Sequence, residues 1–399
     1  MRSVAGKAIL VFFALFALAA CGSSSSGGAG GEVRSDNFPS ASPYVYSVPE
    51  SQNDGWSVGH LADHGFDPEP VTAMIDDIVK RSIVGIDSIS IVRNGTLLVS
   101  ENFRTRLDQF DSWVQNEDLE RHVLHSTSKS FTSALVGIAI EQGYISDTDA
   151  LFYELFSYVS YANQDMRKAT MSLEDALTMR FGMRWDEWSQ SYGSDGNSLT
   201  YLTENNDDYS KALLDLPMEG NPGESFVYNT AGSIAIGQAV ENRIGVPLAD
   251  FAEMYLFAPL QISGAVWGNT PTGLPNGGSG LFLTTREMAK FGQLYIDDGV
   301  WQGEPVISSS WVQRSIQRHV ELNWSDTSGY GYQWWLDRFS VDGQVLESYS
   351  TRGYGGQYIF CVPSLRLVVA FTAHNYGNDP AITPFDLMQT SILPALNQS

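Results

Sequence analysis

Ser126 and Lys129 lie three positions apart in the stretch HSTSKSFTS and are the first residues whose types and spacing could do chemistry. The apolar positions that follow predict a largely buried helix beginning at Ser126. Residues three apart share a helix face, so the Ser126 hydroxyl and the Lys129 amine can meet at the first turn. Ser128 and Ser130 flank the lysine directly and are expected to point elsewhere.

This pair suits nucleophilic catalysis. A serine hydroxyl is a weak nucleophile and needs an adjacent base, which lysine supplies only when its amine is neutral. Burial and a helix N-terminus both favour the neutral amine, and the same N-terminus offers N–H groups to an oxyanion. The alternative is structural, with Ser126 as an N-cap and Lys129 as a solvated first-turn residue. The spacing S-x-x-K alone leaves both interpretations open.

Two further stretches carry candidate chemistry. The segment PGESFVYNTAG places Tyr228 after a Pro-Gly turn and at the start of a predicted helix, where a phenol could shuttle a proton. Far downstream, STRGYGGQYIF begins an edge-like strand whose glycines allow another backbone to approach closely.

The elements that must position these residues form two hairpins and two terminal helices. Residues 87–103 alternate apolar and polar positions around Asn94-Gly95, which predicts a β-hairpin. A second pair of strands is predicted around Pro363-Ser364. Helices are predicted over 70–81 and 384–396. One antiparallel sheet holding both hairpins, flanked by the terminal helices, gives an α+β fold.

The middle of the chain differs from its two ends. SLEDALTM and TAGSIAIGQAVENRIG have helical periodicity. We therefore predict a mainly helical region at 148–260, inserted into a sheet domain formed by 51–147 and 261–399.

Composition narrows the function. The formal charge of −23 leaves no basic surface for phosphates, which argues against nucleic-acid binding.

The six histidines form no helical H-x-x-x-H with a partnering acid, so no metal site and no cofactor are predicted. His125 is expected to be a packing residue, and Cys361, in an apolar strand, a buried structural thiol.

The N-terminal residues 1–20 have two cations followed by an apolar run, the pattern of a secretory signal. Leu18 to Cys21 resembles the lipobox of bacterial lipoproteins, which implies lipidation of Cys21; an ordinary signal peptide is the alternative. The Ser/Gly-rich beginning of residues 21–50 predicts a flexible tether. The sequence thus predicts an exported, membrane-anchored lipoprotein facing the periplasm or the cell surface.

Several motifs in order resemble the serine β-lactamase and penicillin-binding-protein superfamily, in the branch of class C β-lactamases, related esterases and nylon-oligomer (6-aminohexanoate) hydrolases. The resemblance covers about residues 87–374. It rests on LHSTSKSFTSALVGIAIEQGYI, ALTMRFGMRWDEW, PGESFVYNTAG, GGSGLFLTTREMAKFGQLYIDDGVW, YGYQWWL and GYGGQYIFCVPSLRLVVAF. It implies a β-lactamase/transpeptidase-like fold.

The resemblance also implies roles for individual residues. Ser126 would be the nucleophile, Lys129 its base, and Tyr228 the general acid/base that protonates the leaving group and later activates water. The oxyanion hole would be the N–H groups of Ser126 and Tyr354.

The pattern departs from the family at two motifs. The tyrosine motif has Thr230 where Y-x-N has asparagine, and Thr351-Arg352-Gly353 stands where the family has K-T-G. Strand alternation turns Arg352 away from the Thr351 face, which weakens recognition of an anionic β-lactam. Thr230, Thr351 and Gly353 are predicted to contact substrate.

Tryptophans could line an acyl pocket. The candidates are Trp185, Trp188, Trp334 and Trp335, and of these we favour Trp185.

The predicted function is a serine hydrolase that cleaves a small-molecule ester, amide or peptide-like substrate through an acyl-enzyme on Ser126. Two alternatives remain open. One is a β-lactamase or DD-peptidase, and the other is a non-catalytic binding lipoprotein with the same fold.

Overall fold

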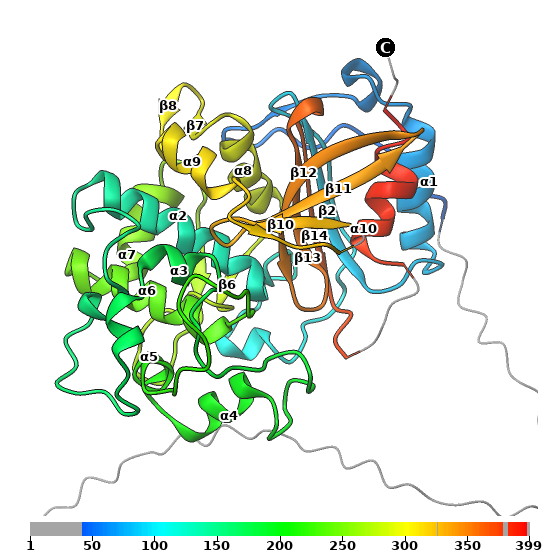
Figure 1. Cartoon of the computed structure of the whole chain (residues 1–399). Helices are drawn as coiled ribbons and strands as arrows, with labels where there is room; N and C mark the ends of the chain where they lie inside the picture. The colour runs from blue at the N-terminus through cyan, green and yellow to red at the C-terminus, as the bar shows by residue number, and fades with distance from the viewer. Residues whose placement is uncertain (1–41, 325, 378–381, 397–399) are drawn as a thin grey trace, which may run out of the picture. The chain divides into compact units, whose positions relative to one another are not determined.

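The computed structural model describes residues 42–324, 326–377 and 382–396 (Figure 1). The predicted signal peptide, Cys21 and most of the predicted tether lie outside these residues. Within the described ranges, no helix combines the length and the apolar character needed to span a bilayer.

The first predicted hairpin is confirmed. Strands β2 (Ile86–Arg93) and β3 (Thr96–Asn102) pair antiparallel around the two-residue turn Asn94-Gly95. Both turn residues have positive φ, 51° and 74°, as a type I′ turn requires. Asn and Gly tolerate this conformation better than other residues, so the turn sets the pairing of Arg93 with Thr96. The register shifts by one residue between Ile91 and Val92.

The second hairpin joins the same sheet, as predicted. Strands β13 (Gln357–Val362) and β14 (Leu367–Ala373) are connected by a 3-10 turn, η7 (Pro363–Leu365). Strand β14 pairs antiparallel with β2, which places the two hairpins side by side. The confirmed α+β sheet has nine strands in the order β1-β3-β2-β14-β13-β12-β11-β10-β9.

The remaining strands of this sheet place β12 away from the edge at which it was predicted. They are β1 (Ser57–Val58), β9 (Val320–Glu321), β10 (Thr327–Tyr330), β11 (Trp335–Val341) and β12 (Gln344–Gly353). All neighbours in the sheet pair antiparallel except β1 and β3, which are parallel. Strand β12 lies between β11 and β13, so its predicted edge-like position is wrong, because β9, β10 and β11 extend the sheet beyond it.

The terminal helices cover one face of the sheet (Figure 1). They are α1 (Pro68–Val79) and α10 (Pro384–Leu387), the latter continued by the π-helical turn η8 (Met388–Ile392). Their apolar residues share a core with inward positions of β2, β13 and β14. Both predicted terminal helices are thus present, with the last one shortened.

Helix α8 (Thr285–Ile296) packs on the opposite face of the sheet. A Cβ on Gly292 would lie 2.5 Å from Val368 and 2.7 Å from Ile359, so glycine permits this close packing. Cys361 is fully buried here and its thiol faces the Gly292 carbonyl at 3.7 Å, which confirms its structural role.

Between residues 148 and 260 the named elements are helices. They are η4 (Phe152–Leu155), η5 (Met166–Thr170), α3 (Leu173–Leu177), α4 (Ser198–Asn205), α5 (Tyr209–Leu214), α6 (Thr230–Ile244), α7 (Leu248–Ala252) and the π-helical turn η6 (Glu253–Phe257). The division of the chain into sheet domain and helical region stays a prediction.

The long buried helix α2 and several short elements complete the described chain. They are η1 (Leu61–His64), η2 (Asp111–Trp113), β4 (His122–Val123), η3 (His125–Thr127), α2 (Ser128–Glu141), β5 (Val266–Trp267), β6 (Leu281–Leu283), β7 (Val300–Trp301), β8 (Glu304–Pro305) and α9 (Ser309–Ser315).

Candidate active site

Ser126 and Lys129 face each other at the start of the nucleophile helix. The 3-10 turn η3 carries Ser126 and runs directly into α2, which carries Lys129. The Lys129 Nζ lies 2.9 Å from the Ser126 Oγ. The flanking serines point elsewhere, since the Ser128 hydroxyl accepts from the Leu281 N–H and the Ser130 hydroxyl donates to the Gln333 carbonyl.

The surroundings of Lys129 favour a neutral amine. The side chain is 1% exposed, and burial lowers its pKa to about 7, although the charge of Glu187 acts in the opposite direction. The Nζ lies 2.7 Å from the Gly278 carbonyl and 3.0 Å from the Thr230 hydroxyl. A neutral amine donates one hydrogen to each of these oxygens and keeps its lone pair for the Ser126 O–H.

Tyr228 completes the group. It directly precedes α6, whose N-cap is Asn229, and the Asn229 side chain accepts from the Gly232 N–H at 2.8 Å. The Lys129 amine lies 5.0 Å from the centre of the Tyr228 ring. Burial and the Glu187 charge raise the pKa of the phenol, and a hydrogen bond with Ser126 offsets part of that rise. The phenol is therefore protonated at neutral pH and can donate a proton.

Glu187 is a residue that the sequence interpretation missed. Its carboxylate is 3% exposed and accepts from both the N–H and the hydroxyl of Thr230, at 2.7 and 2.5 Å. It also accepts from the Trp185 indole at 3.1 Å and the Tyr192 hydroxyl at 3.0 Å. Because the Thr230 hydroxyl donates to Glu187, its lone pairs face the Lys129 amine.

Thr230 therefore lies beside Lys129, and its side chain bonds to protein groups on two sides. Its predicted contact with substrate stays a prediction. The asparagine of this motif is displaced by one position to Asn229, where it caps α6. In the sequence, Glu187 is marked only as one of two acidic residues between the tryptophans of WDEW. Its partner Thr230 is 43 residues away, which no local pattern reveals.

The end of β12 lies against the nucleophile segment. The Thr127 hydroxyl donates to the Thr351 hydroxyl at 3.1 Å, and a Cβ on Gly353 would lie 2.2 Å from the Leu124 carbonyl oxygen. The predicted close backbone approach thus occurs at Gly353. Tyr354 follows β12, and its ring lies 5.7 Å from that of His125, the residue before Ser126. This arrangement brings the two segments proposed for the oxyanion hole together.

Thr351 and Gly353 have structural contacts in this position. Thr351 is 1% exposed, and its hydroxyl also accepts from the Ile359 N–H at 3.1 Å. Their predicted contact with substrate stays a prediction. Arg352 points away from them, as expected from strand alternation, and pairs with the buried Asp337.

His125 packs among aromatic rings, as predicted. Its ring contacts those of Phe110, Trp113, Tyr354 and Tyr376. Burial lowers the pKa of His125 to about 3, so the imidazole is neutral. Its φ of 45° is a left-handed conformation that a non-glycine residue adopts at a cost in free energy, directly before the nucleophile.

The tryptophans separate into two environments, and the preference for Trp185 does not match their positions. Trp185 is buried with its indole N–H bound to Glu187, whereas Trp188 is 52% exposed and stacks on Tyr228 at 4.8 Å between ring centres. Trp335 also stacks on Tyr228, at 5.8 Å. Trp334 lies in the core against Phe291. The exposed aromatic surface beside the phenol is therefore formed by Trp188 and its neighbours.

On this α+β scaffold, Ser126 lies 2.9 Å from the buried Lys129 amine, and the Tyr228 ring lies beside that amine. This is the arrangement that the predicted superfamily implies. Residues 71–388 match the Beta-lactamase family, and the chain belongs to that family. The predicted superfamily and fold are confirmed. The predicted enzyme class, a serine hydrolase of the β-lactamase-related family, is confirmed at this level.

The chain is similar to several proteins. It is 25% identical over 239 residues to the 6-aminohexanoate-dimer hydrolase of Paenarthrobacter ureafaciens, covering 56% of this chain and 60% of that one. A Bacillus anthracis structure, provisionally assigned as a 6-aminohexanoate-dimer hydrolase, superposes with a TM-score of 0.63 at 19% identity, over 87% of this chain and 89% of that one. A family VIII carboxylesterase gives a TM-score of 0.59 at 14% identity, over 84% and 99%.

Proposed function

We propose that this protein hydrolyses a carboxylic ester or amide of a small molecule through an acyl-enzyme on Ser126. The observation that carries the proposal is the 2.9 Å contact between the Ser126 hydroxyl and the buried Lys129 amine. A lysine with a pKa near 7 has a substantial neutral fraction at neutral pH and can act as a general base.

Acylation follows from these positions. Lys129 accepts the Ser126 proton as the Oγ forms a bond to the substrate carbonyl carbon, and the N–H groups of Ser126 and Tyr354 stabilise the oxyanion. The carbonyl reforms as the bond to the leaving group breaks. Tyr228 gives its proton to the departing alkoxide or amine and regains one from the Lys129 ammonium.

Deacylation repeats the sequence with water. The neutral amine of Lys129 accepts a proton from water, directly or through Tyr228, and the hydroxide attacks the acyl carbon. The ester bond to Ser126 breaks, and the Oγ regains a proton. The raised pKa of Tyr228 keeps the phenol protonated between steps, so Lys129 is the group that acts as the base.

The surroundings favour an uncharged ester or amide over an anionic β-lactam. Arg352 is engaged with Asp337, and Thr351 replaces the usual lysine of the strand motif. The exposed aromatic surface at Trp188 and Trp324 suits an apolar acyl or leaving group. The names of the relatives, a 6-aminohexanoate-dimer hydrolase and a carboxylesterase, point to the same classes of bond.

Intact-mass analysis after incubation with p-nitrophenyl butyrate, a fluorophosphonate and benzylpenicillin tests this function. We expect ester turnover and a fluorophosphonate adduct, both abolished in Ser126→Ala and retained in the matched control Ser128→Ala. A stable penicillin adduct without ester turnover would instead support a penicillin-binding protein. Absence of every adduct from folded protein would support a binding lipoprotein.

We also propose that the protein is exported and anchored through lipidated Cys21. The support is the sequence pattern of residues 1–20 and the lipobox-like Leu18 to Cys21. Expression in a bacterial host with labelled palmitate is expected to label the wild type. Cys21→Ser is expected to abolish the label, and a labelled Cys21→Ser protein would exclude this anchor.

A further inference from the structure

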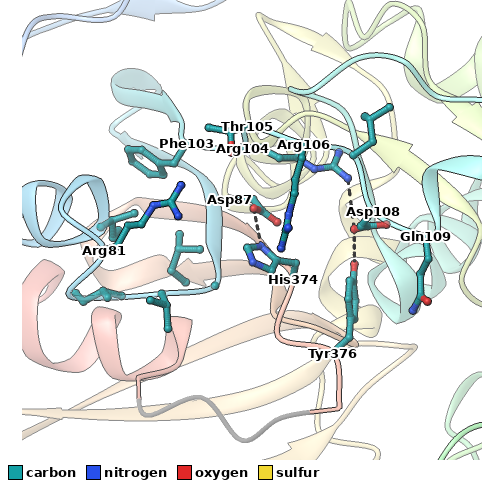
Figure 2. A pocket seen from close by; sticks show the side chains of 16 residues that line it. Arg81, Asp87, Phe103, Arg104, Thr105, Arg106, Asp108, Gln109, His374 and Tyr376 are labelled. Carbon is teal, nitrogen blue, oxygen red and sulfur yellow. Dashed lines mark hydrogen bonds and ion pairs between the residues drawn. The ribbon is translucent and has the colours of Figure 1, made fainter. Parts of the chain in front are cut away.

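A cavity of about 700 Å³ lies apart from the proposed catalytic group (Figure 2). Its walls come from the end of α1, the start of β2, the segment after β3 and the segment after β14. Neither Ser126, Lys129 nor Tyr228 lines it. Its volume is within the range of small-molecule binding sites.

The two carboxylates of the cavity have partners within the protein. Asp87 bonds to His122 at 3.1 Å and to His374 at 2.7 Å. Asp108 accepts from the Tyr376 hydroxyl at 3.3 Å and lies 3.3 Å from the Arg104 guanidinium. These interactions compensate the negative charge on this wall of the cavity.

Two guanidinium groups of the cavity have no such partner. Among the described residues, neither Arg81 nor Arg106 makes a side-chain hydrogen bond or an ion pair with a carboxylate. Figure 2 shows the Arg106 guanidinium beside His374 and the Arg81 side chain reaching into the same hollow from the α1 side. Both arginines are exposed to solvent. Acidic residues outnumber Lys and Arg by 46 to 23 in this chain, so two arginines without a carboxylate partner at one cavity form a local concentration of positive charge.

The backbone at Arg81 is a second, independent observation. Arg81 directly follows Lys80, the C-cap of α1, and has a φ of 61°. Glycine or asparagine is the usual residue at this left-handed position, because other side chains raise the free energy there. An arginine in this position directs its guanidinium toward the cavity at the expense of local backbone strain.

We propose that this cavity binds the carboxylate of an organic acid between Arg81 and Arg106, with the apolar body of the acid against the hydrophobic wall. Planar guanidinium groups match carboxylates in geometry as well as charge. The apolar wall consists of Ile78, Ile83, Val84, Ile86, Phe103 and Leu107. The proposal does not depend on hydrolytic activity.

His374 gives this site a pH dependence. Asp87, Arg106 and Asp108 are the charged groups that face it, and the hydrogen bond to Asp87 has the largest effect, raising the pKa of His374. The imidazolium persists into a higher pH range than that of a free histidine and then loses its charge. Affinity for the carboxylate should therefore fall as pH rises through the pKa of His374, and His374→Gln should flatten that dependence.

Isothermal titration calorimetry of the full chain with hexanoate tests the proposal. We expect saturable binding of hexanoate and much weaker binding of hexanamide, its neutral isostere. Arg81→Gln and Arg106→Gln should each weaken hexanoate binding roughly ten-fold, since each removes a charge-assisted interaction. Arg106→Lys should retain part of the affinity.

The matched control is Arg243→Gln, which removes one exposed arginine from α6 with the same change in net charge. It should bind hexanoate as the wild type does. Equal hexanoate binding by wild type and folded Arg81→Gln/Arg106→Gln would overturn the proposal, because the acid would then bind elsewhere. Binding of inorganic phosphate without binding of hexanoate would overturn it as well.

Discussion

Two buried lysines, one in the proposed active site and one in the helical region, show what separates a base from a structural cation. The Lys168 amine donates to the carbonyls of Ala162 and Leu214, at 3.0 and 2.8 Å. The Lys129 amine meets one carbonyl and two hydroxyls. Burial lowers the pKa of both amines.

The two amines differ in whether their hydrogen-bond partners can donate a hydrogen. A carbonyl oxygen only accepts, so an amine between two carbonyls must donate to both and gains nothing from a free lone pair. A hydroxyl can donate, so the Ser126 O–H can bond to the lone pair of a neutral Lys129. Burial therefore shifts the pKa of either lysine, but only Lys129 lies beside a proton that it can remove.

The largest expected effect separates these two lysines directly. Lys129→Met should lower kcat/KM for p-nitrophenyl butyrate by about 10³-fold or more, because it removes the base. Lys168→Met should leave kcat/KM of the folded enzyme close to wild type. It should instead lower the free energy of unfolding by roughly 1–3 kcal/mol, because the buried Leu214 carbonyl and the partly buried Ala162 carbonyl lose their donor. Initial rates measure the loss of activity, and urea unfolding measures the loss of stability. Equal losses of kcat/KM in Lys129→Met and Lys168→Met would contradict the distinction between the two lysines.

A smaller effect concerns the proton donor. Tyr228→Phe should lower kcat/KM by roughly 10²–10⁴-fold for amides and alkyl esters, whose leaving groups need a proton. The loss should be much smaller for p-nitrophenyl esters, whose leaving group departs as a stable anion. Paired kinetics on the two substrate types measure this, and an equal loss on both would assign Tyr228 to another step.

A pH profile tests the electrostatic part of the contrast. Because neutral Lys129 is required, kcat/KM should rise with pH through a midpoint near 7. The Glu187 charge raises the pKa of Lys129, so Glu187→Gln should move this midpoint to lower pH. Asp215→Asn, which changes a carboxylate near Lys168, should leave the midpoint in place. A midpoint unchanged in Glu187→Gln would contradict this role of Glu187.

The smallest expected effect is at the aromatic surface. Trp188→Ala removes an exposed ring beside Tyr228 and should raise KM a few-fold, because an apolar group of the substrate would lose a stacking partner worth about 0.5–1.5 kcal/mol. The free energy of unfolding should change little. Steady-state kinetics on an aryl ester measure it, and an unchanged KM would place the acyl pocket elsewhere.

Much of the fold could be predicted because the residue patterns that determine it lie within short segments of the chain. Asn94-Gly95 determines a turn, and the spacing of Ser126 and Lys129 determines which side chains share a helix face. Strands β9, β10 and β11 were not predicted, and the position of β12 was consequently wrong. Strands β9 and β10 have only two and four residues, and β11 begins with WLDR, where two apolar residues are followed by two charged ones without alternation.

The site was predicted where its groups lie within motifs that resemble those of the family. Glu187 reaches Thr230 across 43 residues, so its role depends on how the loop before α4 folds over α6. The same loop decides that Trp188 stacks on Tyr228 whereas Trp185 is buried. Sequence identifies both tryptophans but carries no information about which of them the loop leaves exposed.

The central claim is that the Lys129 amine is largely neutral near pH 7.5. The chain contains only six lysines, so protein labelled with ¹³C at lysine Cε gives few NMR signals, and the one absent from Lys129→Met belongs to Lys129. We expect this signal to titrate with a midpoint near 7. A midpoint near 10.5, the ordinary value for lysine, would contradict it, because Ser126 would then have no base.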